Sequence, residues 1–164
     1  MQWDELPDTS PRCDGGLGPP DGSELVARLL TDRNSVPEAM ILQRASLMKP
    51  SGGFSNECGK SSGLSVDRCT DLGDQQIRFH ARAYAQQKSG RETRGAWIAC
   101  VQALRDIRLE DYSGEQLIRV YEDPSEENRR HSVIRVLASI TRTRFSELRA
   151  KMETCFSLRL TPDL

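Results

Sequence analysis

Asp123-Pro124-Ser125-Glu126-Glu127-Asn128 opens the stretch from which we predict the fold, and this stretch runs on to Phe156. Asp123 is a favourable N-cap, and Pro124 suits the first helical position, where its missing N–H costs nothing. The two glutamates that follow place negative charge at the positive end of a helix dipole. These signals predict that a helix begins here.

Apolar side chains then recur at intervals of three and four residues, which is the helical spacing. They are Ile134, Leu137, Phe145, Leu148, Met152 and Cys155, with the polar Thr141 at one position of the series. The stretch is therefore predicted as one long helix, or as two helices that break near Thr141–Thr143.

The segments that precede this stretch also show helical patterns. Helices are predicted over Gln75–Lys88 and Arg91–Arg108, and a shorter one opens with a capping box formed by Ser113 and Gln116. Short connections favour antiparallel neighbours, and no stretch alternates convincingly with period two. The predicted fold class is all-α, a four- to five-helix bundle over residues 74–158 with an N-terminal helical arm on a flexible linker.

The N-terminal part of the chain has a different composition. Residues 1–22 are rich in proline and glycine and are predicted to form a disordered tail. Residues 23–49 contain two helix start signals and are predicted as the helical arm. Residues 50–73 are rich in serine and glycine and are predicted as the linker, while residues 159–164 form a short tail.

Length, charge and cysteine usage limit the classes of protein. The 164 residues suit one domain, and a net charge of −1 gives no general argument for a nucleic-acid or membrane partner. No apolar run approaches the roughly 18 residues that a membrane span needs. Five cysteines, an odd number without a CxxC pair or a signal peptide, predict free thiols in a reducing compartment, the cytoplasm or the nucleus.

Two short patterns resemble binding motifs but lack what the motifs require. Gly59-Lys60-Ser61 matches the end of a phosphate-binding loop, yet Phe54 stands where that loop needs its first glycine. Cys58, Cys69 and His80 are too far apart for the ligand pairs of structural zinc sites. The sequence therefore predicts neither a cofactor nor a metal.

Catalytic arrangements are equally unsupported by the sequence. His131 and Ser132 are adjacent, and neighbours on a helix point about 100° apart. Cys100 lies in an apolar stretch and is expected to be an inert packing residue. We therefore expect no catalytic residue, and an enzyme with an unrecognised site is only the third hypothesis.

The first hypothesis for function is a non-enzymatic regulatory or adaptor protein that binds another protein, or a second copy of itself, through helices. The apolar side chains of the predicted arm and tail are the candidate contacts, and the arm can dock on its own domain or on a partner. These residues are Trp3, Met40, Ile41, Leu47 and Met48.

The alternative hypothesis is a helical nucleic-acid-binding domain. Arg135, Arg142 and Arg149 are seven residues apart, so they share a face if the C-terminal stretch is one helix. Such a face could contact phosphates. Nucleic acid is therefore the alternative partner.

Overall fold

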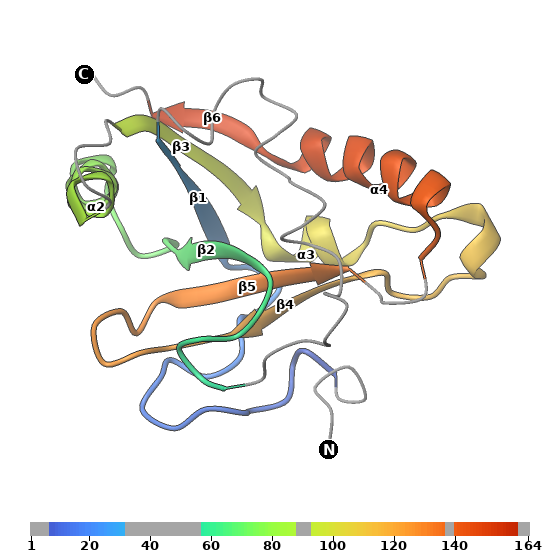
Figure 1. Cartoon of the computed structure of the whole chain (residues 1–164), viewed down its shortest axis with the longest axis horizontal. Coiled ribbons are helices and arrows are strands. Elements are labelled where there is room, and N and C mark those ends of the chain that lie inside the picture. Colours follow the sequence, from blue (N-terminus) through green and yellow to red (C-terminus); the bar gives the residue numbers. More distant parts are fainter. Residues whose placement is uncertain (1–6, 32–56, 88–92, 137–139, 161–164) are drawn as a thin grey trace.

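The protein is built around one antiparallel sheet of six strands in the order β4-β5-β2-β1-β3-β6 (Figure 1). This is a computed structural model, which describes residues 7–31, 57–87, 93–136 and 140–160. The strands are β1 (Leu25–Thr31), β2 (Leu64–Arg68), β3 (Thr93–Cys100), β4 (Ile118–Glu122), β5 (His131–Val136) and β6 (Ser157–Leu160).

Helices cover both faces of the sheet. The helix α2 (Asp74–Gln87) packs Ile77 and Ala81 against β1 and β3 on one face. The short α3 (Val101–Arg105) and the longer α4 (Arg142–Cys155) cover the other face, and a 3₁₀ turn (Glu110–Tyr112) follows α3. Figure 1 shows α2 and α4 on opposite sides of the strands, so the fold is a layered α/β arrangement.

Two hydrophobic clusters lie on the two faces of the sheet. The larger joins strand residues such as Val26 and Ile134 to Phe145 and Leu148 of α4. The smaller joins Ala27 and Leu29 of β1, among others, to α2. Adjacent residues of β1, such as Val26 and Ala27, bury their side chains on opposite faces of the sheet, as the pleat of a strand requires.

The predicted all-α bundle is wrong, and the cause is burial on both faces. A strand covered on one face alternates between apolar and polar residues, but a strand covered on both reads as a continuous apolar run. In β1 both Val26 and its neighbour Ala27 are buried, at 0% and 1% exposure. Periodicity alone cannot distinguish such a run from part of a buried helix.

The C-terminal stretch divides near Thr141, the weakest position of its predicted helical pattern. His131–Val136 is β5, and the helix begins only at Arg142, with Thr141 as its N-cap. The Thr141 side chain accepts a hydrogen bond from the Arg144 N–H at 3.3 Å. The predicted apolar face is correct within α4, where Phe145 and Leu148 are buried, but the predicted helix start at Asp123 is wrong.

The other predicted helices have mixed outcomes. The helix over Gln75–Lys88 agrees with α2, whereas Arg91–Arg108 contains the strand β3 and only five residues of helix in α3. The expected capping box at Ser113 is a turn into β4, with φ values of 44° at Ser113 and 76° at Gly114. In β3 and β4 the sheet context overrides local helix signals.

Parts of the predicted arm and of the predicted linker are strands of the sheet. Leu25–Thr31 of the predicted helical arm is β1, and residues 32–49 lie outside the described residues. Within the predicted linker, Leu64–Arg68 is β2, which lies inside the sheet between β5 and β1. Its residues Leu64 and Val66 are buried, so this segment contributes to the core.

Residues 7–22, expected to form a tail, lie against the sheet. The buried carboxylate of Asp8 accepts hydrogen bonds from Arg105 Nε at 2.8 Å and from the Val120 N–H at 2.7 Å. Cys13 forms a disulfide with Cys58, with Cα atoms 6.0 Å apart, so the prediction of free thiols is wrong for this pair. Among the described residues, no helix is long and apolar enough to cross a membrane.

Candidate functional site

A cleft opens over β1 and β2, on the face of the sheet that carries α2. It consists of two adjoining cavities of about 210 and 410 Å³, which share residues of β1, β2, α2 and the β4–β5 hairpin loop. Cavities of this size are typical of small-molecule sites. Polar side chains that line the larger one are Arg28, Lys60, Asp67, Tyr84, Asn128 and His131.

The β4–β5 hairpin loop forms one wall of the cleft and is organised by Asn128. The Asn128 carbonyl accepts a hydrogen bond from the Ser125 N–H at 3.1 Å, and its own N–H donates to Ser125 Oγ at 3.0 Å. Its side-chain amide donates to Asp67 Oδ1 on β2 at 2.8 Å. The loop is therefore fixed both internally and to the neighbouring strand.

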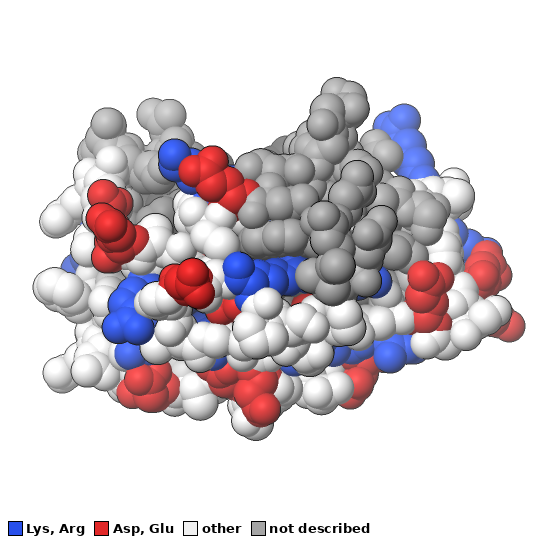
Figure 2. Space-filling view, turned by 90° about the horizontal axis from the view of Figure 1, so that it is seen from below, with Lys and Arg blue, Asp and Glu red and all other residues white. Residues whose placement is uncertain are grey.

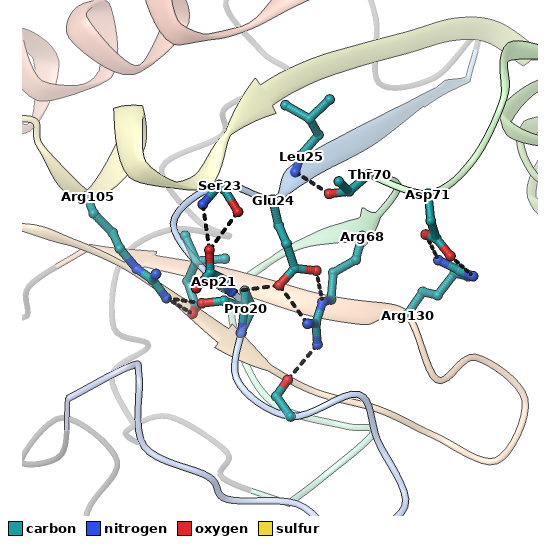
Figure 3. A network of polar contacts seen from close by, with 12 residues as sticks. Pro20, Asp21, Ser23, Glu24, Leu25, Arg68, Thr70, Asp71, Arg105 and Arg130 are labelled. Carbon is teal, nitrogen blue, oxygen red and sulfur yellow. Dashed lines mark hydrogen bonds and ion pairs between the residues drawn. The ribbon is translucent and has the colours of Figure 1, made fainter.

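A second attachment holds the far end of this loop. Arg130 makes a two-pronged contact with the Asp71 carboxylate, with distances of 2.5 and 2.9 Å. Figure 3 shows these two side chains facing each other beside the Arg68–Glu24 pair, which joins β2 to the segment before β1. Asp71 therefore holds Arg130, the residue before His131.

Asp123 lies at the start of the hairpin loop and is fully buried. Its carboxylate accepts hydrogen bonds from the N–H groups of Gly59, at 2.8 Å, and Ser61, at 3.3 Å. Both donors belong to the loop before β2. A buried carboxylate is costly unless it is hydrogen-bonded, and these backbone groups supply part of that compensation.

The His131 ring supplies the remaining compensation for the buried Asp123 carboxylate. Its Nδ1 lies 3.0 Å from Asp123 Oδ2 and 3.0 Å from the Asp123 carbonyl oxygen. Because both neighbours are acceptors, Nδ1 carries the hydrogen and donates it. Neutral His131 therefore keeps the lone pair on Nε2, and the residue lines the larger cavity.

The pKa of His131 is raised above its ordinary value of 6.5. Burial of the ring lowers the pKa, but the hydrogen bonds to Asp123 and the negative charges of Asp123 and Asp67 outweigh this effect. Asp67 lies directly opposite His131 in the β2–β5 register. The Asp123 carboxylate thus favours the protonated form of the ring, as it would favour an imidazolium formed by general-base catalysis.

The loop that holds Asp123 is itself tightly placed. Gly59 has a φ of +82°, and a Cβ at this position would lie 3.1 Å from Ser125 Cβ and 3.3 Å from the Pro124 carbonyl. The adjacent Cys58 is bonded to Cys13 of the N-terminal segment. Close packing on one side and a covalent link on the other therefore fix the N–H donors.

The predicted partner-binding residues do not meet this site. Trp3, Met40, Ile41, Leu47 and Met48 all lie outside the described residues. The protein-binding role assigned to them stays a prediction.

The predicted basic face depends on a helix that does not form. Arg135 lies in β5, with 2% exposure, and its Nε donates to the Ser62 carbonyl, whereas Arg142 and Arg149 lie in α4. The seven-residue spacing therefore does not place the three on one face. The surface in Figure 2 carries acidic and basic side chains side by side, and nucleic-acid binding stays a prediction.

Sequence reasoning missed the Asp123–His131 pair because it assigned both residues to one helix. A hairpin brings its two ends together, so Asp123 and His131 meet across eight positions. The dipeptide Asp123-Pro124 is also a turn signal, and Asn128 favours turns as well. These signals could have suggested the loop, but no local signal points to Gly59 or Ser61 as donors.

The fold and the site together define a class, an antiparallel α/β protein with a His–Asp pair in a cleft over the sheet. No protein-family model, curated protein or solved structure matches the chain. The functional argument therefore depends on the geometry of the cleft.

Proposed function

We propose that the protein is an enzyme in which His131 acts as a general base toward water or a substrate bound in the cleft. The observation that carries this proposal is the buried Asp123 carboxylate, which fixes Nδ1 of His131 as a donor. This arrangement leaves Nε2 as the basic nitrogen, and the residue lines the larger cavity. The reaction class that it supports best is hydrolysis of a carboxylic or phosphoric ester.

In such a reaction Nε2 takes a proton from water while the water oxygen forms a bond to the ester carbon or phosphorus. The resulting imidazolium is stabilised by its hydrogen bond to the Asp123 carboxylate. The same proton then passes from Nε2 to the oxygen of the leaving group as the ester bond breaks. General acid–base catalysis of this kind contributes about 100- to 10,000-fold in rate.

The test is turnover of chromogenic carboxylic esters and phosphodiesters by the wild type and two variants. His131→Gln is expected to lower kcat by about 100- to 10,000-fold. Asp123→Asn removes the negative charge but not the burial, so the pKa of His131 should fall below its ordinary value. The acidic limb of the pH–rate profile, which reports deprotonation of the base, should move to lower pH with it.

Arg142→Gln is the control, because Arg142 lies exposed on α4 and lines neither cavity of the cleft. It should change neither the rate nor the pH profile. Retention of the wild-type rate by His131→Gln, or a pH profile that Asp123→Asn leaves in place, would contradict general-base catalysis by this pair.

A second candidate is the protein-binding function predicted from the sequence, now on a different element. Phe79 of α2 is 69% exposed, and aromatic residues are enriched at protein–protein interfaces. If α2 binds a partner, Phe79→Ser should abolish capture of that partner while His131→Gln preserves it. Equal capture by wild type and Phe79→Ser would reject this candidate.

The proposed location follows from the sequence, which favours the cytoplasm or the nucleus. The Cys13–Cys58 disulfide argues against it, because glutathione keeps most cytosolic thiols reduced. Alkylation of thiols at the moment of cell lysis decides between the two. Alkylation of Cys13 and Cys58 would support the cytoplasm or nucleus. A disulfide that resists alkylation would indicate an oxidising compartment.

A further inference from the structure

The sheet divides between β1 and β2, and the larger cavity lies at this division. The two strands pair only through Val26 with Arg68 and Ala27 with Asp67. Beyond these residues β1 continues along β3, whereas β2 continues along β5. Figure 1 shows the two strands diverging. By the register, Arg28 is the first residue of β1 past the paired segment.

Arg28 spans this division. Its Nη1 donates to the Ser65 carbonyl of β2 at 3.0 Å, while its Nε is buried and, among the described residues, has no hydrogen-bond partner. No ion pair of Arg28 occurs among the residues that the structure describes. The nearby Asp67 already accepts a hydrogen bond from Asn128. A largely buried guanidinium with an unused donor is costly, and burial lowers its pKa.

The charges that line the larger cavity favour a ligand with one negative charge. Its cations among the described residues are Arg28 and Lys60, and Lys60 forms an ion pair with Glu57 Oε1 at 3.5 Å. The carboxylates of Asp67 and Asp123 accept hydrogen bonds from Asn128 and from the Gly59 N–H. Arg28 is therefore the lining cation that lacks an ion pair within the described part of the chain, and a ligand with one negative charge matches it.

We propose that Arg28 is the binding residue for a singly charged oxyanion of the substrate, a carboxylate or a phosphodiester. Two oxygens of such a group match the guanidinium fork and accept from Nε and Nη2 together. Tyr84 and Lys60 line the same cavity and add polar side chains to it. This inference deepens the proposed function, because it places the substrate's anionic end in the cavity that His131 lines.

The test is binding of acetate and of dimethyl phosphate, measured by the ¹⁵N NMR signal of Arg28 Nε–H in the full chain. Either anion should move this signal in a saturable way, and the one that does so identifies the ligand source. Arg28→Gln should weaken binding, followed by the His131 ring signals, by about 10- to 100-fold. Arg28→Lys keeps the charge but loses the fork, so it should also weaken binding.

Arg142→Gln is the control, because Arg142 is exposed on α4. It should bind the anions as the wild type does. If Arg28→Gln does not fold, as judged by circular dichroism, Arg28→Lys and the wild-type Nε–H signal carry the test.

The inference is overturned if neither anion moves the Arg28 signal, or if the Arg28 variants bind as tightly as Arg142→Gln. Tighter binding of inorganic phosphate than of both monoanions would also overturn it, because the cavity would then prefer two charges. None of these readouts depends on turnover. Anion binding at Arg28 with no effect of His131→Gln on activity would reject the proposed enzyme and leave this site in place.

Discussion

The substitution Gly59→Ala should destabilise the protein more than an equivalent substitution elsewhere, because Gly59 is both left-handed and closely packed. Its φ of +82° is a conformation that costs a residue with a side chain about 1 kcal/mol or more. Gly114→Ala is the matched control, since Gly114 has a φ of +76° and nothing within 4 Å of a Cβ. The control should therefore show the backbone cost alone, about 1 kcal/mol.

At Gly59 the added methyl group would also meet the hairpin loop, at 3.1 Å from Ser125 Cβ and 3.3 Å from the Pro124 carbonyl. The loop must then move by a few tenths of an ångström and weaken the 2.8 Å hydrogen bond from Gly59 to Asp123. Hydrogen bonds to charged groups contribute about 1.5–3 kcal/mol. We expect a total loss of about 3 kcal/mol for Gly59→Ala.

Reversible denaturant unfolding, followed by circular dichroism under oxidising conditions, measures both losses. Amide hydrogen exchange provides the local readout. Protection at residues 59 and 61 should fall in Gly59→Ala beyond its loss of global stability, and it should keep pace with global stability in Gly114→Ala. Equal destabilisation by the two substitutions, with unchanged relative protection, would refute the idea that this loop forms the hydrogen-bonded support of Asp123.

Three further predictions concern the pH dependence and the ties that hold the N-terminal segment. The pKa of His131 is raised in the folded state, so its contribution to stability is complete below the unfolded value of about 6.5 and is lost as pH rises through the folded value. His131→Gln should therefore reduce the pH dependence of the unfolding free energy across this window. Asp8→Ala leaves the buried Arg105 charge unpaired and should cost about 3–5 kcal/mol in urea unfolding, and removing both charges should recover much of it. Reducing the Cys13–Cys58 disulfide, which spans 45 residues, should cost about 4 kcal/mol, measured by unfolding with and without reductant, and Cys13→Ser should show no further response to reductant.

The helices that the sequence predicts well are those with a solvent face. In α2, Ile77, Ala81 and Ala85 are buried while many residues between them are exposed, so the period of 3.6 is visible. The same holds for Phe145, Leu148 and Met152 in α4. These amphipathic patterns arise from one-sided burial, which a single sequence records directly.

The central strands show no comparably clear periodic pattern in the sequence. Leu64 and Val66 of β2 have a weak alternating pattern in a segment whose serines and glycines otherwise suggest a linker. The pairing of β2 with β1 and β5 is formed with residues far away in sequence, and loop closure of that kind is not encoded locally. Tertiary context therefore decides the structure of this segment.

The candidate site is hard to predict for a related reason, because much of it consists of backbone groups. The N–H groups of Gly59 and Ser61 hold Asp123, and any residue type supplies such donors. Only the left-handed conformation at position 59 restricts the sequence. A search for chemically distinctive side chains finds His131 but not the support that orients it.

This use of the backbone has a chemical consequence for the site. Within the described part of the chain, Asp123 forms no ion pair with arginine or lysine, and His131 is its cationic partner. A guanidinium in that place would bind the carboxylate permanently and lower its attraction for the imidazolium. Neutral N–H donors instead stabilise the buried carboxylate while they leave its charge available to His131. The raised pKa of His131 follows from this choice of donors.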